Sequence, residues 1–177
     1  HLLMMSFYRP EGKRNKILME AGAFPSDQYA VETQVRMYGL DPKEAIIEVA
    51  PREGAYILEE EDILQAIEKT GDSLALVIMG GVNYYTGQFF NLKKITEAAH
   101  RVGAYAGFDL AHAVGNVVLQ LHDWNIDFAC WCSYKYLNSG PGGVGGVYVH
   151  EHHAQNPKVF RLGGWWGNEE KNRFKME

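Results

Sequence analysis

One lysine, Lys135, lies between an apolar, aromatic run and a glycine-rich turn, where a surface lysine has no evident reason to be. The surrounding residues 129–143 read ACWCSYKYLNSGPGG. A lysine removed from water loses its proton more easily than its ordinary pKa of roughly 10.4 implies. The neutral amine can then form a Schiff base with an aldehyde cofactor. The ordinary alternative is a strand-end lysine whose stem covers apolar surface while its ammonium reaches solvent.

Asp109 and His112 are the next candidates, because they follow the hydrophobic segment 104–108. A carboxylate at the end of such a strand can pair with a protonated pyridine nitrogen and keep that ring electron-withdrawing, as a pyridoxal phosphate site requires. By itself Asp109 is equally typical of a helix N-cap, and His112 of a hydrogen-bonded core histidine. Beside Asp109, His112 becomes a candidate contact for the phenolic oxygen or the ring of the cofactor.

The segment 24–27, with sequence FPSD, follows an expected strand and opens an expected helix. In that position Phe24 could stack on a flat cofactor ring, while Ser26 and Asp27 offer hydrogen-bonding groups at the start of the helix. A hydrophobic staple with a capping serine or aspartate explains the same residues equally well. The loop 83–87 follows another apolar run and is expected to border the same edge of the sheet.

Apolar runs and helical periodicity alternate along the chain, which predicts an α/β fold. We expect strands at 16–20, 45–50, 74–79, 104–108, 128–133 and 146–149, and helices at 28–38, 63–69 and 92–101. The uninterrupted apolar run 74–79 is typical of a parallel strand covered on both faces. Strands separated by helices imply right-handed crossovers and a mainly parallel sheet flanked by helices, with chemistry at the carboxyl ends of the strands.

Three further motifs receive structural interpretations. The stretch 140–145 matches G-x-G-x-x-G, but a strand rather than a helix follows it, so we interpret it as a tight connection between strands and not as a dinucleotide site. The histidines within 150–153 lack a carboxylate at ligand spacing, so we expect a solvated turn and no metal site. The paired tryptophans at 165–166 indicate a ligand or partner contact as readily as plain core.

The composition limits the class of protein. The chain has 177 residues, 46% hydrophobic and 22% charged, as expected for one globular domain with a sizeable core. A net charge of -5 argues against nucleic acid as a partner. No apolar run is long enough to span a bilayer, and the first residues lack the features of a secretory signal. Cys130 and Cys132 are expected to be buried as small hydrophobes rather than bonded or metal-bound, which favours a reducing, cytoplasmic setting.

The strand-end aspartate, the Ala-His pair and the later Ser-Tyr-Lys before a glycine turn resemble a fold-type I pyridoxal phosphate enzyme. Within that group the chain is similar to the kynureninase family. The resemblance runs over essentially the whole chain, and its most specific segment is 127–138. It is carried by segments 24–27, 108–116, 121–124, 127–138, 164–167 and 173–176. The resemblance implies that residues 1–177 are part of the large cofactor-binding domain.

The resemblance also implies roles for the matching residues. Lys135 would hold pyridoxal 5'-phosphate as a Schiff base, Asp109 would pair with its ring nitrogen, and His112 would contact the ring region. The segment 24–27 would lie on the ring, with Phe24 stacked on it. Tyr134 would bind the phosphate and take part in proton transfer, and Trp165 would reach the phosphate of a neighbouring subunit in a homodimer. The implied cofactor-binding set is Phe24, Pro25, Ser26, Asp27, Asp109, His112, Tyr134, Lys135 and Trp165, and the implied catalytic pair is Lys135 and Tyr134.

The implied reaction is hydrolysis of L-kynurenine or 3-hydroxykynurenine to anthranilate or 3-hydroxyanthranilate and L-alanine, in tryptophan catabolism and NAD synthesis. Two residues depart from the family pattern. Gly80 replaces the usual serine or threonine near the cofactor, and Trp166 replaces an aromatic that is often phenylalanine. Family enzymes are more than twice this length. Because the chain begins at His1 inside an apolar run, we expect a piece of a longer protein that is inactive by itself.

Two alternatives stay open on the sequence. The first is another class V enzyme, such as a cysteine desulfurase or an aminotransferase. Desulfurases typically carry Ala-Gln after the ring aspartate and histidine before the lysine, where this chain has Ala111-His112 and Tyr134. The second is a catalytically inactive α/β interaction domain that keeps the scaffold. Absorbance of bound pyridoxal phosphate distinguishes an enzyme from such a domain.

Overall fold

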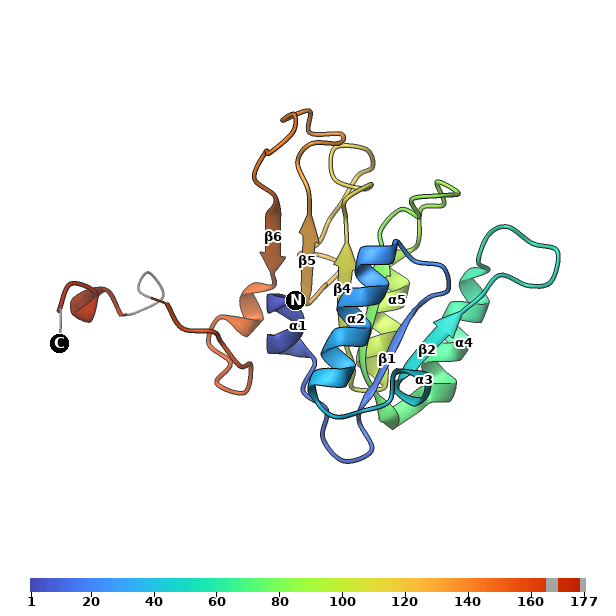
Figure 1. Ribbon diagram of the computed structural model, residues 1–177, viewed down its shortest axis with the longest axis horizontal. Coiled ribbons are helices and arrows are strands. Elements are labelled where there is room, and N and C mark those ends of the chain that lie inside the picture. Colours follow the sequence, from blue (N-terminus) through green and yellow to red (C-terminus); the bar gives the residue numbers. More distant parts are fainter. Residues whose placement is uncertain (165–168, 176–177) are drawn as a thin grey trace.

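The computed structural model describes residues 1–164 and 169–175, and its centre is one six-stranded sheet (Figure 1). The strand order is β2-β1-β3-β4-β5-β6. β1 to β5 are parallel, whereas β6 pairs antiparallel with β5 at the edge. The predicted mainly parallel α/β sheet is therefore confirmed. The strands are β1 (Lys16–Glu20), β2 (Ile46–Val49), β3 (Leu74–Gly80), β4 (Tyr105–Asp109), β5 (Phe128–Trp131) and β6 (Gly146–Val149).

Helices cover both faces of this sheet (Figure 1). One face packs against α1 (Leu2–Phe7) and α2 (Pro25–Met37), and the other against α4 (Glu60–Thr70) and α5 (Leu92–Arg101). Side chains alternate along β1, because Leu18 joins the core under α4 and α5 while Ile17 and Met19 join the core under α1 and α2. β3 is buried along most of its length, which confirms the strand predicted to be covered on both faces.

The start of α2 differs from the prediction. The helix begins at Pro25, and Phe24 is its N-cap, with the Phe24 carbonyl accepting hydrogen bonds from the Asp27 and Gln28 amides at 2.9 and 3.2 Å. The predicted Ser26-Asp27 cap is therefore wrong, and both residues lie in the first turn. Proline favours the first helical position because its φ is already helical and its missing N–H would have no partner there.

Two smaller differences lie elsewhere in the sheet. The short helix α3 (Pro42–Ala45) precedes β2 and includes the first residue of the strand expected at 45–50. Its N-cap is Asp41, whose carboxylate accepts a hydrogen bond from the Lys43 amide at 3.0 Å. β5 ends at Trp131, earlier than expected, because the chain then folds back until the Ser139 amide donates to the Ser133 carbonyl at 3.1 Å.

The segments that follow β3, β4 and β5 leave the sheet at one edge. The Gly81 amide donates to the Asp109 carbonyl at 2.7 Å, and the Leu110 amide donates to the Cys130 carbonyl at 2.8 Å. These two bonds continue the parallel ladder past the strand ends, so the first loop residues remain hydrogen-bonded to the sheet. Within the described residues, no helix has the length and apolar character needed to cross a membrane.

Candidate active site

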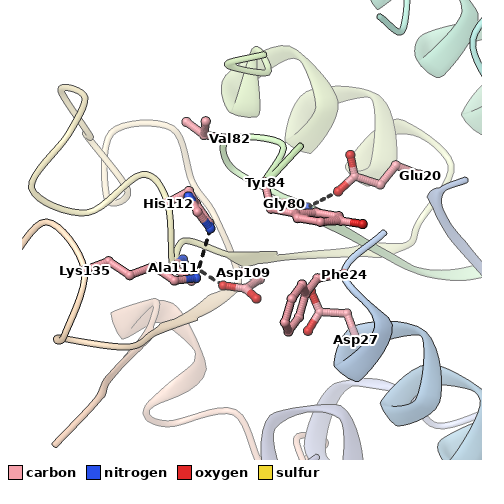
Figure 2. Close-up of a pocket in the computed structure, with 10 residues that line it drawn as sticks. All are labelled: Glu20, Phe24, Asp27, Gly80, Val82, Tyr84, Asp109, Ala111, His112 and Lys135. Carbon is pink, nitrogen blue, oxygen red and sulfur yellow. Dashed lines mark hydrogen bonds between the residues drawn. The ribbon is translucent and has the colours of Figure 1, made fainter. Parts of the chain in front are cut away.

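A pocket opens at the carboxyl edge of the sheet, where parallel α/β folds usually bind ligands (Figure 2). Five residues predicted from the sequence line it together: Phe24, Asp27, Asp109, His112 and Lys135. They come from the start of α2, the end of β4 and the loops after β4 and β5. The remaining lining residues are Glu20, Gly80, Val82, Tyr84 and Ala111. The loop 83–87, which was expected to border the site, contributes Tyr84.

Lys135 faces the pocket and contacts His112. The Nζ of Lys135 lies 2.9 Å from the Nε2 of His112. Burial, followed by the positive charge of Lys135, lowers the pKa of His112. The imidazole is therefore neutral near pH 7, and its Nε2 can accept a hydrogen bond from the lysine. The alternative in which this lysine extends into bulk solvent is not what the structure shows, since the side chain is partly buried against other pocket residues.

Asp109 ends β4 with one oxygen already bonded. Its Oδ1 accepts a hydrogen bond from the Ala111 amide at 2.7 Å, which fixes the carboxylate above the strand end. The residues after it form turns instead of a helix, so the helix N-cap interpretation is wrong. Figure 2 shows the carboxylate directed toward Phe24 and Asp27. Asp109 is thus positioned to face a cation, such as a protonated ring nitrogen, that enters the pocket.

Asp27 reaches the same place from the first turn of α2. Burial, followed by the negative charge of Asp109 and a hydrogen bond with it, raises the pKa of Asp27 to about 7. Two neighbouring carboxyl groups cannot both ionise cheaply, so burial beside Asp109 favours the protonated form of Asp27. A cationic ligand would relieve that repulsion, which makes the pair suited to a positively charged ring.

Phe24 presents its ring to the pocket instead of acting as a hydrophobic staple. The side chain is 48% exposed, and its ring packs edge-on against Tyr84 with centroids 5.3 Å apart. The Nζ of Lys135 lies 5.9 Å from the centroid of the same ring. A flat molecule attached to Lys135 would therefore have an aromatic face beside it.

Glu20 is the main site residue that the sequence interpretation missed. It ends β1, is only 4% exposed, and accepts hydrogen bonds from the Gly80 amide at 3.2 Å and the Asn83 side-chain amide at 3.0 Å. Burial raises its pKa, although these two hydrogen bonds oppose the shift. The signal was present in the sequence, because a carboxylate directly after the buried run Ile17–Met19 is unusual.

The structure also clarifies Gly80. A Cβ built on Gly80 would lie 2.9 Å from the Oε1 of Glu20. A serine or threonine at this position would therefore displace the Glu20 carboxylate. In this chain, Glu20 occupies the space beside the strand end that a side chain at position 80 would need.

Three predicted cofactor contacts do not line the pocket among the described residues. Pro25 and Ser26 lie in the first turn of α2 and are exposed. Tyr134 is 54% exposed, with its ring centroid 5.8 Å from the Nζ of Lys135, and a hydrogen bond with the Cys132 thiol raises its pKa. Trp165, together with Trp166, lies outside the residues that the structure describes.

Two other sequence interpretations concern cysteines and histidines. Cys130 and Cys132 are free and partly buried, and burial raises the pKa of the Cys130 thiol to about 11, so this thiol is not a reactive thiolate. The turn at 150–153 is not generally solvated, because His150 and His153 are 7% and 4% exposed. The solvated-turn interpretation is wrong for these two rings, since the turn folds back over the start of β5.

Comparison with known proteins places this site in a family. The sequence pattern of the aminotransferase class-V family matches residues 40–172, and the chain belongs to that family. It is 60% identical to the kynureninase of Nematostella vectensis over 99% of its length, and 57% identical to that of Homo sapiens over 100%. The chain covers 38% of the length of each of these two relatives. The similarity to kynureninases inferred from the motifs is confirmed.

Solved structures share the fold at much lower identity. A cystine C-S lyase matches with a TM-score of 0.69 at 19% identity, covering 85% of this chain and 38% of the other. A ureidoglycine-glyoxylate aminotransferase from Bacillus subtilis matches with a TM-score of 0.66 at 24% identity, covering 86% of this chain and 36% of the other. At these identities the likeness establishes the architecture alone.

Proposed function

We propose that the full-length protein carrying this chain catalyses the pyridoxal phosphate-dependent hydrolysis of L-kynurenine or 3-hydroxykynurenine. The products are anthranilate or 3-hydroxyanthranilate and L-alanine. The observation that carries the proposal is the convergence of Lys135, His112 and Asp109 in one pocket at the carboxyl edge of the sheet. Identity of 57–60% to kynureninases over nearly the whole chain supports this choice of reaction.

The pocket residues fit pyridoxal phosphate. Lys135 supplies an amine for its aldehyde, Asp109 a carboxylate for its ring nitrogen, and Phe24 an aromatic face for its ring. The raised pKa of Asp27 beside Asp109 supports this fit, because a positively charged ring would offset the repulsion between the two carboxyl groups. When bound, pyridoxal phosphate withdraws electrons from the α-carbon of the amine that it holds.

The chain's own residues then have distinct tasks. Lys135 is the amine that attaches the cofactor and, once released, the base that can move the α-proton. His112 holds Lys135 Nζ at 2.9 Å and, being neutral, can accept a proton from it or return one. General acid–base steps of this kind typically contribute about 10²–10⁴-fold. Asp109 is held by the Ala111 amide and keeps negative charge at the ring nitrogen.

Several finer assignments belong to the same proposal. Tyr134 and Trp165 would contact the cofactor phosphate, the latter across a homodimer interface, and Pro25 and Ser26 would complete the contact of the segment 24–27. The chain would be part of the large cofactor-binding domain, so its 177 residues would be inactive alone. Two free, closely spaced cysteines support a reducing compartment, and we assign the protein to the cytoplasm.

The decisive experiment is an anthranilate assay on the full-length protein with both substrates, together with the visible absorbance of protein-bound pyridoxal phosphate. Lys135→Ala should remove the lysine-bound absorbance and essentially all turnover. The matched control is Lys93→Ala, because Lys93 is an exposed lysine on α5 that does not line the pocket. Cofactor binding without turnover of either substrate would overturn the kynurenine assignment. Absence of cofactor binding in the wild type would overturn the enzyme proposal itself.

The cysteine desulfurase alternative predicts sulfide release from cysteine under the same conditions. The residues beside the cofactor positions argue against it, because His112 and Tyr134 stand where desulfurases typically carry glutamine and histidine. Size measurement by light scattering tests the homodimer, and a monomeric active enzyme would contradict it. Turnover of kynurenine by the isolated 177 residues would contradict the expectation that the chain is inactive alone.

A further inference from the structure

A second cluster of side chains, which could bind a metal ion, surrounds Asp127. It lies at the amino ends of the parallel strands, whereas Lys135 lies beyond their carboxyl ends. Asp127 directly precedes β5, whereas Lys135 follows it, so the two sites lie at opposite ends of that strand. Because β6 runs antiparallel to β5, the short 3-10 helix η2 (Glu151–His153) after β6 returns to the start of β5. The cluster therefore plays no part in the function proposed above.

The Asp127 carboxylate is buried and held on one side by protein groups. Its side chain is only 2% exposed. Its Oδ2 accepts hydrogen bonds from the Ala106 amide at 2.7 Å and from the Nε2 of His100 at 2.8 Å. These two bonds fix the orientation of the carboxylate and leave Oδ1 directed at the histidines of η2.

Three ligand atoms converge on the other side. The Oδ1 of Asp127 lies 2.8 Å from the Nε2 of His153 and 3.6 Å from the Nε2 of His152. The two histidine Nε2 atoms are themselves 2.8 Å apart. His153 is 4% exposed, and its Nδ1 has no hydrogen-bond partner within the described part of the chain, so the polar contacts of its ring are those of Nε2.

One proton cannot satisfy these contacts. A neutral ring nitrogen carries either one hydrogen or one lone pair in the ring plane. If His153 directs a hydrogen from Nε2 at Asp127, it has no lone pair to accept a hydrogen bond from His152. If it accepts from His152 instead, its nitrogen lone pair faces the carboxylate oxygen of Asp127. A cation between the three atoms satisfies all of them at once.

The distances also suit a metal ion. The three distances among Asp127 Oδ1, His152 Nε2 and His153 Nε2 place the centre of their triangle about 1.8 Å from each atom. An ion slightly above the plane of this triangle can therefore lie at the roughly 2.0–2.2 Å that is typical of zinc bonds to nitrogen and oxygen. Imidazole and carboxylate ligands favour zinc and similar transition metals over magnesium. The Ala106 amide and His100 would act as the outer groups that orient a ligating carboxylate.

We propose that Asp127, His152 and His153 form a binding site for a divalent transition-metal ion of the zinc class. Three protein ligands leave one tetrahedral position for water. The ion enters from the His152 side, because that side chain is 41% exposed while the other two ligands are buried. Bound metal would tie η2, and with it the edge strand β6, to the start of β5.

The test is a titration of the chelator-treated, full-length protein with Zn²⁺, followed by calorimetry, with Mg²⁺ as a comparison. We expect one saturable Zn²⁺ site and no competition from millimolar Mg²⁺. His152→Gln should weaken Zn²⁺ binding at least about tenfold, and His100→Gln, which removes an outer partner of the carboxylate, by about tenfold. His152 is the best ligand to replace because it is the most exposed of the three, so its loss perturbs the fold least.

The matched control is His122→Gln. His122 stacks on His150 and contacts Glu151, so it borders the same turn without contributing a ligand atom. This variant should bind Zn²⁺ like the wild type. Replacing Zn²⁺ with Co²⁺ gives a second readout, since the visible spectrum of a four-coordinate Co²⁺ site should be present in the control and lost in His152→Gln. Equal Zn²⁺ affinity in the wild type and His152→Gln, or absence of a saturable site, would overturn the proposal.

Discussion

The carboxyl groups of Asp27 and Asp109 are hydrogen-bonded neighbours where the start of α2 meets the end of β4, and they bring together two segments that are far apart in the sequence. Burial and the neighbouring Asp109 raise the pKa of Asp27 to about 7. Ionising Asp27 beside Asp109 therefore costs stability, and a cation bound between the two carboxyl groups would offset that cost. Asp27 and Asp109 each have an ordinary structural explanation when taken alone, and together they form a site that favours a cation.

Asp27→Asn should change how stability depends on pH. In the unfolded chain Asp27 ionises near 3.8, whereas in the folded protein it keeps its proton until about 7. The folded state binds more protons between these values, so the wild type loses stability as pH rises through that window. The variant should be more stable than the wild type by about 1–3 kcal/mol at pH 8, with a smaller gain at pH 5.

Urea unfolding of the cofactor-free, full-length protein at both pH values measures this difference. Asp123→Asn is the control, because that carboxylate is exposed and pairs with the neighbouring His122 at the surface. It should show no comparable gain at pH 8. An Asp27→Asn variant with the same pH dependence as the wild type would contradict the pairing.

His112 should titrate at higher pH when Lys135 is removed. Burial is the largest cause of its lowered pKa, and the charge of Lys135 is the second. Lys135→Ala removes the second cause and leaves the first largely intact, so the pKa of His112 should rise while staying below its ordinary value. Proton NMR of histidine ring resonances across pH measures this in the cofactor-free protein. The resonance of His122, whose pKa Glu151 raises, should not move, and an unchanged His112 would show that the 2.9 Å contact does not form in solution.

Glu20 should contribute to stability through the two donors that it satisfies. Glu20→Ala leaves the partly buried Gly80 amide and the Asn83 side chain without their acceptor and should cost about 2–3 kcal/mol of unfolding free energy. Glu20→Gln keeps one acceptor oxygen and should cost about 1 kcal/mol. The urea concentrations at the midpoint of unfolding distinguish the two variants, provided that the m-value stays the same. Equal losses for both variants would mean that volume, and not hydrogen bonding, determines the effect.

Gly107 should not tolerate a side chain. A Cβ at this position in β4 would lie 2.1 Å from the Phe128 ring of β5. Gly107→Ala should therefore destabilise the protein by about 1–3 kcal/mol, because a packed ring cannot move far enough. Thermal or urea unfolding measures the loss, with Gly163→Ala as a control, since a Cβ there lies within 4 Å of no atom in the described part of the chain. Adding Phe128→Leu to Gly107→Ala should cost less than the sum of the two single changes, and full additivity would contradict the contact.

Local sequence patterns predicted most of the fold. β1, β6 and α5 begin and end where the periodicity places them, because each has a short apolar pattern bounded by strong breakers. The errors lie where local alternatives differ little in energy. A helix can begin at Pro25 or after a Ser26 cap with little difference in local energy. The direction in which the chain arrives from β1 determines that Phe24 is the N-cap.

The candidate site was predictable only in part. Lys135, Asp109 and His112 are visible because charged or polar residues follow apolar runs, and their residue types match a known chemistry. Glu20 has the same signal but no familiar motif around it, so its bonds to Gly80 and Asn83 became apparent only in three dimensions. The cluster at Asp127 gave only part of its signal: the histidines within 150–153 stand out in the sequence, but β5, the Lys135 loop and β6 separate them from their carboxylate.

The sequence by itself determined which chemical groups are present, which segments become strands and helices, and which family the chain resembles, because these follow from local residue types and spacing. Only the tertiary structure decided which groups meet. The parallel register brings Asp109 and Lys135 to one edge, and the antiparallel return of β6 brings His153 to Asp127 at the other. The raised pKa of Asp27 and the crowded ligand atoms at Asp127 are consequences of burial and proximity, and neither property exists in a chain read residue by residue.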